Sequence, residues 1–497
     1  MSSKVSLLHQ DLIKARYVLP LHKRIIKRIV LLRQKLLALR AAQRLGAAIF
    51  ITTVNGCATE KFDNRPIAIS KISNNLLTKS LTTDDLRACT TKHSPKDSVD
   101  WPPSEWSLNS MTIAAFCMNI DIQAARLKLD IAIATVTTAA QRPNPVVQLP
   151  LQKTLNPSTG QSPWSLGLAL DFPIETAGKR DLRMLVANDN VAAAQLNISR
   201  VSWAVRSQLR LLLLSLWFSE ERTKLLQKQV EIEERLELLI EHRSAVGYAS
   251  TLEVSQQRHA LVQARKNIAG NLQDVDSVKI KIASLVGVRT SAFGLTPFNV
   301  REFGNPRAIP PDEKTRLSVL QNRADVLSSL VDYESSQSAL QLEVAKQYPD
   351  LHLGPGYTLD QGSRKIGLTF SGLELPLFNQ NQGAIAEARG RRLEAESKVK
   401  KIVETAFLET DLATKAYDAS IIAFNYAQTQ YSFAGRRLAA AHASLFSGED
   451  DQISVLSAEK SKVDSELNLL DAILQIQHAI GQIEDAMQHP LHEPIPQ

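Results

Sequence analysis

The chain has 497 residues, 44% of them hydrophobic and 22% charged, a composition that excludes an intrinsically disordered protein. Its formal charge of +7 comes from the first 44 residues, which hold 11 Lys and Arg against one acid, Asp11. The remainder carries 47 basic and 50 acidic residues, so the charge gives no argument for nucleic-acid binding.

Residues 1–56 have the pattern of a bacterial lipoprotein export signal. After the basic stretch comes an apolar run that ends at Val54 and is too short to span a membrane as a helix. The following letters VNGC resemble a lipobox, in which Cys57 becomes the first mature residue and carries a covalent lipid. The alternative is a basic amphipathic helix followed by a buried cysteine. Apart from this lipid, the sequence predicts no cofactor.

Residues 57–105 are expected to form an N-terminal periplasmic segment of unassigned fold. Besides Cys57, the chain has two cysteines, Cys89 and Cys117, whose spacing fits no zinc-binding pattern. Cys117 lies on the apolar side of a predicted helix, which favours a packed thiol there. A disulfide between the two cysteines in an oxidising compartment is the alternative.

Two segments predict helices of unusual length. Proline is absent from 174–296 and from 377–489, and no glycine interrupts 179–246. At about 1.5 Å per residue, a helix over the last range is roughly 100 Å long and cannot fold back onto an ordinary core. Within it, "LLQKQVEIEERLELLIEHR" repeats apolar residues at intervals of three and four, which indicates coiled-coil packing against other helices.

Four short segments show the two-residue alternation of β-strands, at 146–155, 164–172, 351–359 and 365–375. The apolar positions of the last one change phase near Ser371 and Gly372, which predicts a β-bulge. Strands of this length, apolar on one side and small or polar on the other, suit the wall of an outer-membrane barrel. The alternative is an amphipathic sheet that lies on a soluble core.

The chain is internally duplicated. A series of glycine and apolar residues that begins at Gly247 recurs 201 positions later, beginning at Gly448. Each half reads as helix, two strands, long helix, turn and helix, which places repeat 1 at 106–300, repeat 2 at 301–487 and a tail at 488–497. Four strands cannot close a membrane barrel, whereas three copies supply twelve, an even number in the allowed range.

The duplicated pattern, the segment "LDFPIETAGKRD" and residues 348–388 resemble the TolC family of outer-membrane efflux ducts, and 348–388 is especially similar to its CzcC-type heavy-metal branch. The resemblance covers roughly residues 106–487. It implies a mainly α fold with a small β part, in which a long coiled-coil-like α-helical barrel continues four transmembrane β-strands per chain. It further implies a homotrimer that shares a 12-stranded β-barrel.

From this resemblance we expect a passive duct and not an enzyme, lipid-anchored in and spanning the outer membrane of a Gram-negative bacterium. The expected partners are a periplasmic adaptor (membrane fusion protein) and an inner-membrane RND-type pump. The expected cargo is heavy-metal cations such as cobalt, zinc and cadmium. Multidrug efflux or type I secretion is the alternative within this fold, and a coiled-coil periplasmic scaffold is the alternative of another class.

Two kinds of functional position follow. Pro173 and Pro376 are expected at the joints where a strand gives way to a long helix. The turns between long helices are expected at the periplasmic tip, as gate and adaptor contact. Their residues are Gly247, Tyr248, Gly448, Glu449, Asp450 and Asp451. The three acids, repeated threefold, would form a cation-attracting ring, and the alternative for an Asp at this point is a helix N-cap.

The histidines give no metal site. His242 and His442 fall near the predicted tips and His352 falls on a predicted strand, while His489 and His492 lie in the tail. The spacing of the last two is a weak pattern, and solvated tail side chains are the simpler interpretation.

Overall fold

The computed structural model describes residues 62–81, 83–93, 103–157, 159–293, 297–305, 313, 316–317, 321 and 323–491. The predicted export signal and Cys57 lie outside these residues. The chain divides into two compact units, the first made of Met1–Ile120, Trp203–Asn322 and Glu409–Gln497, the second of Asp121–Ser202 and Arg323–Leu408. Each unit takes segments from both halves of the sequence, so the units do not coincide with the two predicted repeats.

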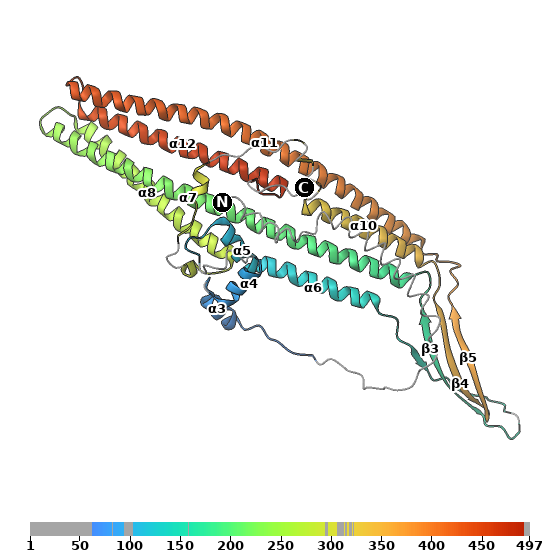
Figure 1. The fold of residues 1–497 in the computed structure, drawn as a ribbon. Helices are drawn as coiled ribbons and strands as arrows, with labels where there is room; N and C mark the ends of the chain where they lie inside the picture. Colours follow the sequence, from blue (N-terminus) through green and yellow to red (C-terminus); the bar gives the residue numbers. More distant parts are fainter. Residues whose placement is uncertain are drawn as a thin grey trace. The chain divides into compact units, whose positions relative to one another are not determined.

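Most of the described residues are helical, and a small sheet completes the fold, in agreement with the predicted class (Figure 1). The helices are α3 (Ile69–Thr78), α4 (Asp84–His93), α5 (Leu108–Met118), α6 (Ile120–Ala140), α7 (Lys179–Ala245), α8 (Thr251–Val286), α10 (Ala324–Ala345), α11 (Gln382–Ser447) and α12 (Gln452–Met487). Two 3₁₀ helices, η1 (Thr290–Phe293) and η2 (Arg301–Gly304), follow α8. Among the described helices, none combines the length and apolar character that a membrane crossing requires.

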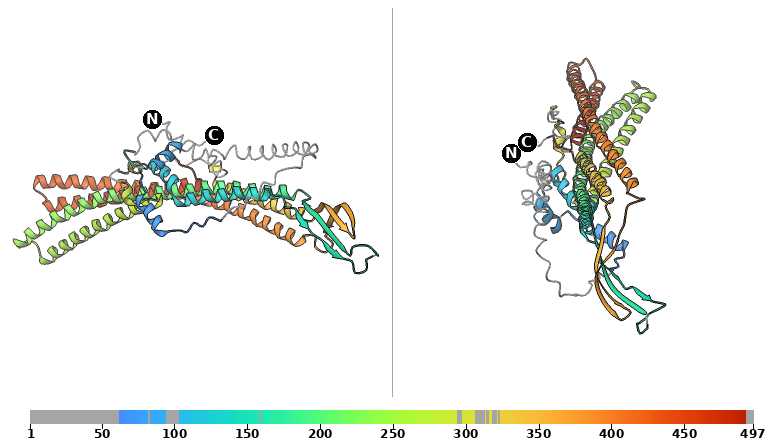
Figure 2. Two further views of the ribbon diagram at one scale, coloured as in Figure 1. Left: turned by 90° about the horizontal axis from the view of Figure 1, so that it is seen from below. Right: turned by 90° about the vertical axis from the view of Figure 1, so that its right-hand side faces the viewer.

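The predicted internal duplication is confirmed by the two helical hairpins α7–α8 and α11–α12 (Figures 1 and 2). The helices α7 and α11 have 67 and 66 residues, and α8 and α12 have 36 each. Both ends of α12 lie 201 positions after those of α8, the spacing found in the sequence. Long runs without proline allow helices of this length because no backbone donor is missing.

In the first unit the long helices pack side by side in the order α8, α7, α12, α11. Val230 of α7 packs against Leu261 of α8, and Ile232 of α7 packs against Leu456 of α12. Tyr417 of α11 joins a cluster with apolar residues of α12. On α8 one series of covered positions recurs at alternating steps of three and four residues, the pattern of coiled-coil packing. They are Val254, Gln257, Leu261, Ala264, Ile268, Asn271, Val275, Val278 and Ile282.

A buried polar network links α7 to α12. The Arg210 guanidinium contacts the Glu484 carboxylate at 3.2 Å and donates to the backbone and side-chain oxygens of Gln477 at 3.0 and 3.1 Å. Gln477 in turn donates to the Phe303 carbonyl at 3.0 Å. The guanidinium lies over Gly481, where an added Cβ would meet its Nη1 at 2.5 Å. Glycine at this helical position therefore makes room for the ion pair.

The start of the tail is folded rather than solvated, and the prediction for His489 is wrong. His489 is 7% exposed, and its backbone N–H donates to the Glu484 carbonyl at 3.1 Å. The Leu491 N–H donates to the Glu484 carboxylate at 3.1 Å. A single buried carboxylate thus anchors both the tail and α7, which a reading of the local sequence does not reveal. His492 lies outside the described residues.

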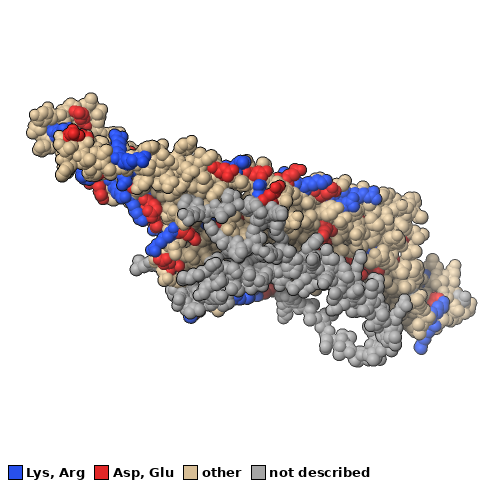
Figure 3. Space-filling model, turned by 45° about the horizontal axis from the view of Figure 1, so that its top comes forward, with Lys and Arg blue, Asp and Glu red and all other residues tan. Residues whose placement is uncertain are grey.

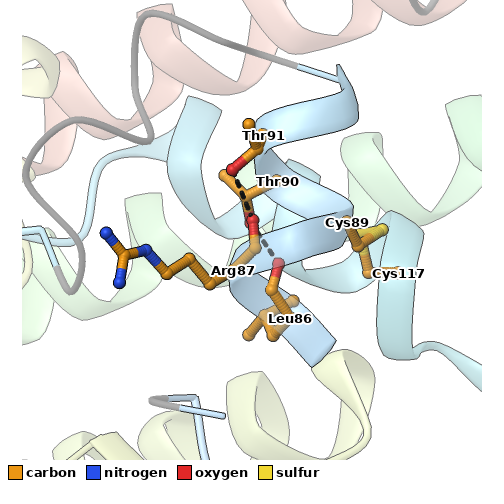
Figure 4. Close-up of a disulfide and its surroundings, with 6 residues drawn as sticks. All are labelled: Leu86, Arg87, Cys89, Thr90, Thr91 and Cys117. Carbon is orange, nitrogen blue, oxygen red and sulfur yellow. Dashed lines mark hydrogen bonds between the residues drawn. A yellow bond between two sulfur atoms is a disulfide. The ribbon is translucent and has the colours of Figure 1, made fainter. Parts of the chain in front are cut away.

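The N-terminal segment is covalently attached to the first repeat. Cys89 of α4 and Cys117 of α5 form a disulfide with Cα atoms 6.3 Å apart (Figure 4), so the packed thiol predicted for Cys117 is wrong and the alternative holds. Near it, the Thr90 hydroxyl donates to the Leu86 carbonyl at 2.8 Å within α4. Leu86 itself is buried. The disulfide therefore ties α4 covalently to α5.

The sheet belongs to the second unit, and its strand order is β1-β3-β4-β5, with β2 also paired to β3. The strands are β1 (Val146–Gln148), β2 (Leu151–Lys153), β3 (Trp164–Ile174), β4 (Leu351–Asp360) and β5 (Ser363–Leu373), all antiparallel to their neighbours. His352 pairs with Gly372 and the next residue, Leu353, pairs with Phe370. This leaves Ser371 as the extra residue on β5 and confirms the predicted bulge.

The strand predicted at 146–155 is interrupted. It consists of β1 and β2, which pair with β3 in one continuous register on either side of Leu149 and Pro150. Proline has no N–H to give to the ladder, but its carbonyl still accepts from the Gly167 N–H at 2.8 Å. A Cβ on Gly167 would lie 2.6 Å from the Pro150 ring, so the glycine admits the proline at this edge.

Candidate functional site

The sheet has one apolar face, and that face is exposed. The register places Leu166 opposite Leu359 and Leu168 opposite Tyr357, so apolar residues of neighbouring strands share one side. On β5 the same face carries Ile366, 85% exposed, and Leu368, 75% exposed. No described part of the chain covers these side chains, in contrast to a sheet that lies on its own soluble core.

The opposite face is polar and better covered. It pairs Ser165 with Asp360 and Gly167 with Thr358. Asp171, on the same face, is buried, and its carboxylate contacts His352 Nδ1 at 3.1 Å. The sheet is therefore inverted relative to one in a water-soluble domain, because its apolar face is the exposed one. This arrangement suits a wall between hydrocarbon and water.

The first strand-to-helix joint is a short, hydrogen-bonded connector. Pro173 is the next-to-last residue of β3, and α7 begins five residues after the strand ends. Within the connector, the Thr176 hydroxyl donates to the Pro349 carbonyl at 2.6 Å and its N–H donates to the Asp350 carboxylate at 3.0 Å. Lys179 completes the joint with an ion pair to Asp350 at 2.8 Å. The joint of repeat 1 is thus fixed to the segment of repeat 2 that leads into β4.

The second joint is longer and uses other residues. Pro376 lies between the end of β5 and the start of α11, in connector 374–381. The Asn381 amide donates to the Glu343 carbonyl of α10 at 2.8 Å and to its carboxylate at 2.9 Å. Both connectors end on a residue with positive φ, Gly178 and Asn381, 203 positions apart. Glycine and asparagine tolerate that conformation best, and this shared signal was available in the sequence.

The two helical turns end their long helices in the same way. Gly247 and Gly448 have φ of +85° and +75°, the left-handed conformation that commonly stops a helix. Tyr248 is 82% exposed, and Phe446, which the sequence analysis did not single out, is 96% exposed. The turns therefore present uncovered aromatic side chains. Glu449 is also exposed.

Both short helices are capped at these turns. Ser250 and Glu253 form a capping box at the start of α8. Asp451 is the N-cap of α12, accepting from the Ser454 N–H at 2.9 Å, so the N-cap interpretation is confirmed. This hydrogen bond holds the pKa of Asp451 below its usual value. Asp451 also pairs with Arg243 of α7 at 2.9 Å, so its charge is already engaged.

The face of the molecule in Figure 3 shows no large charge patch of one sign. Figure 3 shows Lys and Arg side chains interspersed with Asp and Glu along the visible helices. His242 and His442 are exposed and lie on α7 and α11. Within the described residues, no three His, Cys, Asp or Glu side chains are grouped to hold a metal ion. The described residues therefore indicate function through the architecture and through individual side chains, and not through a metal cluster.

Known proteins share this architecture. Residues 114–288 and 317–487 match the sequence profile described as "Outer membrane efflux protein". The chain is 26% identical over 273 residues to the cobalt-zinc-cadmium resistance protein CzcC of Cupriavidus metallidurans, covering 54% of this chain but only 63% of CzcC. It is 22% identical over 339 residues to the pyoverdine export outer membrane protein OpmQ of Pseudomonas aeruginosa, covering 64% of this chain and 70% of OpmQ.

Structural comparison gives the same fold. The crystal structure of the outer membrane protein VceC of Vibrio cholerae aligns with a TM-score of 0.63 at 18% identity. The alignment covers 77% of this chain and 96% of VceC. At this identity the similarity establishes the fold and says nothing of cargo.

Proposed function

Because the chain belongs to the outer membrane efflux protein family, we propose that it is the exit channel of a tripartite efflux system that exports divalent heavy-metal cations. Channels of this family are passive ducts rather than enzymes, and they work as homotrimers with an adaptor and an inner-membrane pump. The observation that carries the proposal is the inverted sheet, because exposing an apolar face is unfavourable in water and favourable in a bilayer.

The edges of the sheet support assembly into a shared barrel. One edge is formed by β1 and β2, and the other by β5. In a bilayer, each unpaired backbone group along an edge costs several kcal/mol. Pairing β5 of one copy with β1 and β2 of the next removes both edges at once. With β1 and β2 counted as one interrupted strand, three copies bring twelve strands. Closure by this head-to-tail contact produces a ring of identical subunits.

The helices leave equivalent edges. In the order α8, α7, α12, α11, the outer helices are α8 and α11. Beside its covered positions, α11 has a second stripe at coiled-coil spacing, which is exposed. Its members are Leu408, Leu412, Ile422, Tyr426 and Phe433. On α8, Leu252, Val262 and Ile280 are exposed in the same way. Packing α11 of one copy against α8 of the next covers both stripes and closes a helical tunnel.

The cysteines support a proposed compartment and a proposed anchor. A disulfide such as Cys89–Cys117 persists in oxidising compartments, which include the bacterial periplasm. This supports export of the chain, as the leader pattern predicts. We propose that Cys57 is lipidated and anchors the outer-membrane channel, since it follows that leader directly. Loss of radiolabelled palmitate incorporation in Cys57→Ser tests this step.

The helical turns are proposed as the periplasmic tip, where the channel closes and meets the adaptor. Their exposed aromatic residues, Tyr248 and Phe446, offer apolar contacts to an adaptor. The pair Arg243–Asp451 links the two turns of one chain. Because Asp451 already pairs with Arg243, Glu449 and Asp450 remain as candidate members of a lumenal acidic ring.

Metal cations are proposed as cargo because CzcC, which matches this chain over 273 residues, is described as a cobalt-zinc-cadmium resistance protein. The second candidate is export of an organic molecule, since OpmQ is described as exporting pyoverdine and its match covers more of this chain. A coiled-coil scaffold is set aside because the family consists of channels. Type I secretion is not favoured by either relative.

Deletion of the gene separates the two candidates. For metal export, tolerance to zinc, cobalt and cadmium falls while antibiotic tolerance is unchanged, and the full-length gene restores it. Loss of antibiotic tolerance alone contradicts the metal assignment and favours export of organic molecules. Recovery of a heat-sensitive trimer from outer-membrane fractions tests the channel itself. A detergent-free monomer would contradict both candidates.

A further inference from the structure

One histidine of the sheet is held by a carboxylate on the neighbouring strand. His352 on β4 pairs with Pro173 on β3, and Asp171 lies two residues before Pro173, hence on the same face of the sheet. His352 Nδ1 lies 3.1 and 3.3 Å from the two oxygens of Asp171. Asp171 is 8% exposed and His352 is partly exposed, so the carboxylate is fixed and the ring is not covered.

This contact determines the chemistry of the free ring nitrogen. An ionised carboxylate only accepts hydrogen bonds, so Nδ1 of His352 must carry the hydrogen. In the neutral ring, Nε2 then has its lone pair available. Histidines that bind metals commonly donate their other N–H to a carboxylate in this way, which orients the ring and raises its basicity. The pair therefore has half of a metal-site arrangement, a carboxylate that orients an imidazole.

The residues beside His352 on the polar face are glycines. The residue opposite His352 on β5 is Gly372, where an added Cβ would meet nothing within 4 Å. The next residue of β4 on the same face is Gly354. There a Cβ would lie 1.6 Å from the Leu170 carbonyl, so no larger residue fits beside Asp171. The imidazole consequently stands between glycines on the polar face.

From this geometry we propose that Nε2 of His352, oriented by Asp171, is a transient binding site for divalent transition-metal cations on the polar face of the sheet. The inference rests on the proposed function, in which that face lines the duct. One imidazole with water as the remaining ligands binds weakly. Weak binding suits conduction, since a cation must enter a site and also leave it. Three copies of the chain provide three such sites.

The test is protection from chemical modification in the purified full-length protein in detergent. Diethyl pyrocarbonate modifies accessible imidazoles, and peptide mass spectrometry reports each histidine separately. Zn²⁺ is expected to protect His352 at a concentration roughly tenfold or more below that needed for His242 and His442, which serve as internal references. Mg²⁺, which prefers oxygen ligands, is expected to protect none of them.

Two variants distinguish an oriented ligand from an ordinary ion pair. Asp171→Asn is expected to raise the half-protecting Zn²⁺ concentration roughly tenfold. The matched control Asp360→Asn, on the same face at the far end of β4, leaves it unchanged. Absence of Zn²⁺ protection at His352, or an unchanged value in Asp171→Asn, overturns the inference. Gene deletion that affects antibiotic tolerance alone overturns the proposed cargo instead, whatever His352 does in the purified protein.

Discussion

Arg243, three residues before the turn at the end of α7, contacts Asp451, the N-cap of α12, at 2.9 Å. The contact joins the end of α7 in repeat 1 to the start of α12 in repeat 2. Both side chains are about half exposed, so the pair contributes on the order of 0.2 to 1 kcal/mol. A contact of this strength links the two turns but is weak enough to be broken by a competing interaction.

The first prediction concerns this pair. Arg243→Gln is expected to raise the open probability of the channel in planar bilayers, because the two turns lose their link. Asp451→Asn is expected to do the same without loss of the helix start, since asparagine is as good an N-cap as aspartate. In the double variant the effects do not add. An additive result would show that each residue acts through other partners.

The second prediction concerns Gly481. Gly481→Ala is expected to lower the free energy of unfolding by roughly 1 to 3 kcal/mol, because the new methyl group displaces the Arg210 guanidinium from Glu484. Gly270 on α8 is the matched control, since an added Cβ there meets nothing within 4 Å. Gly270→Ala should stabilise its helix by about 0.5 to 1 kcal/mol. Thermal unfolding of the trimer measures both changes.

The third prediction concerns pH. Burial raises the pKa of Asp189 to about 6, although Ser338 donates to its carboxylate at 3.1 Å. Because this value exceeds the ordinary 3.8, the native state holds the proton more tightly than the unfolded chain. The resulting stabilisation is complete below 3.8 and is lost as the pH rises through 6. Neutral Asp189→Asn is therefore expected to be more stable than the parent at pH 7.5.

The difference in melting temperature between Asp189→Asn and the parent should shrink as the pH is lowered from 7.5 to 4. The same substitution at Asp130, an exposed acid of α6, provides the comparison and should show no such trend. A difference for Asp189→Asn that is constant with pH would mean that the side-chain charge is not its cause.

The fourth prediction concerns the disulfide. Cys89 and Cys117 are 28 positions apart, and a cross-link over that distance stabilises by roughly 3 to 4 kcal/mol through the unfolded chain. Replacing both cysteines by serine should make residues 62–93 sensitive to protease while the long helices remain resistant. Reduction of the parent protein should reproduce that pattern. Equal protease resistance with and without the disulfide would show that packing around Leu86 is sufficient.

The sequence was most informative where structure is local. Long stretches without proline predicted α7 and α11, period-two alternation predicted β3, β4 and β5, and the phase change at Ser371 predicted its bulge. The Asp before Ile453 was interpretable as an N-cap because a cap involves residues three positions apart. The repeat spacing located both turns, since helical hairpins of equal length end at equal offsets.

The sequence was least informative where partners are distant. The buried position of His489 depends on Glu484 and α7, and the Cys89–Cys117 disulfide depends on how α4 packs against α5. Neither is visible in spacing alone. The joint contact of Thr176 with Asp350 spans 174 positions and involves residue types that are common everywhere. Such contacts require the fold before they can be recognised.

The inverted sheet has a consequence for how the protein reaches its working form. A lone chain exposes an apolar face that is unfavourable in water, and its two unpaired sheet edges are unfavourable in hydrocarbon, so neither environment suits it alone. Folding of the chain and assembly of the copies must then be one event, which is completed in the bilayer. The measured stability will accordingly depend on the protein concentration, as for other obligate oligomers.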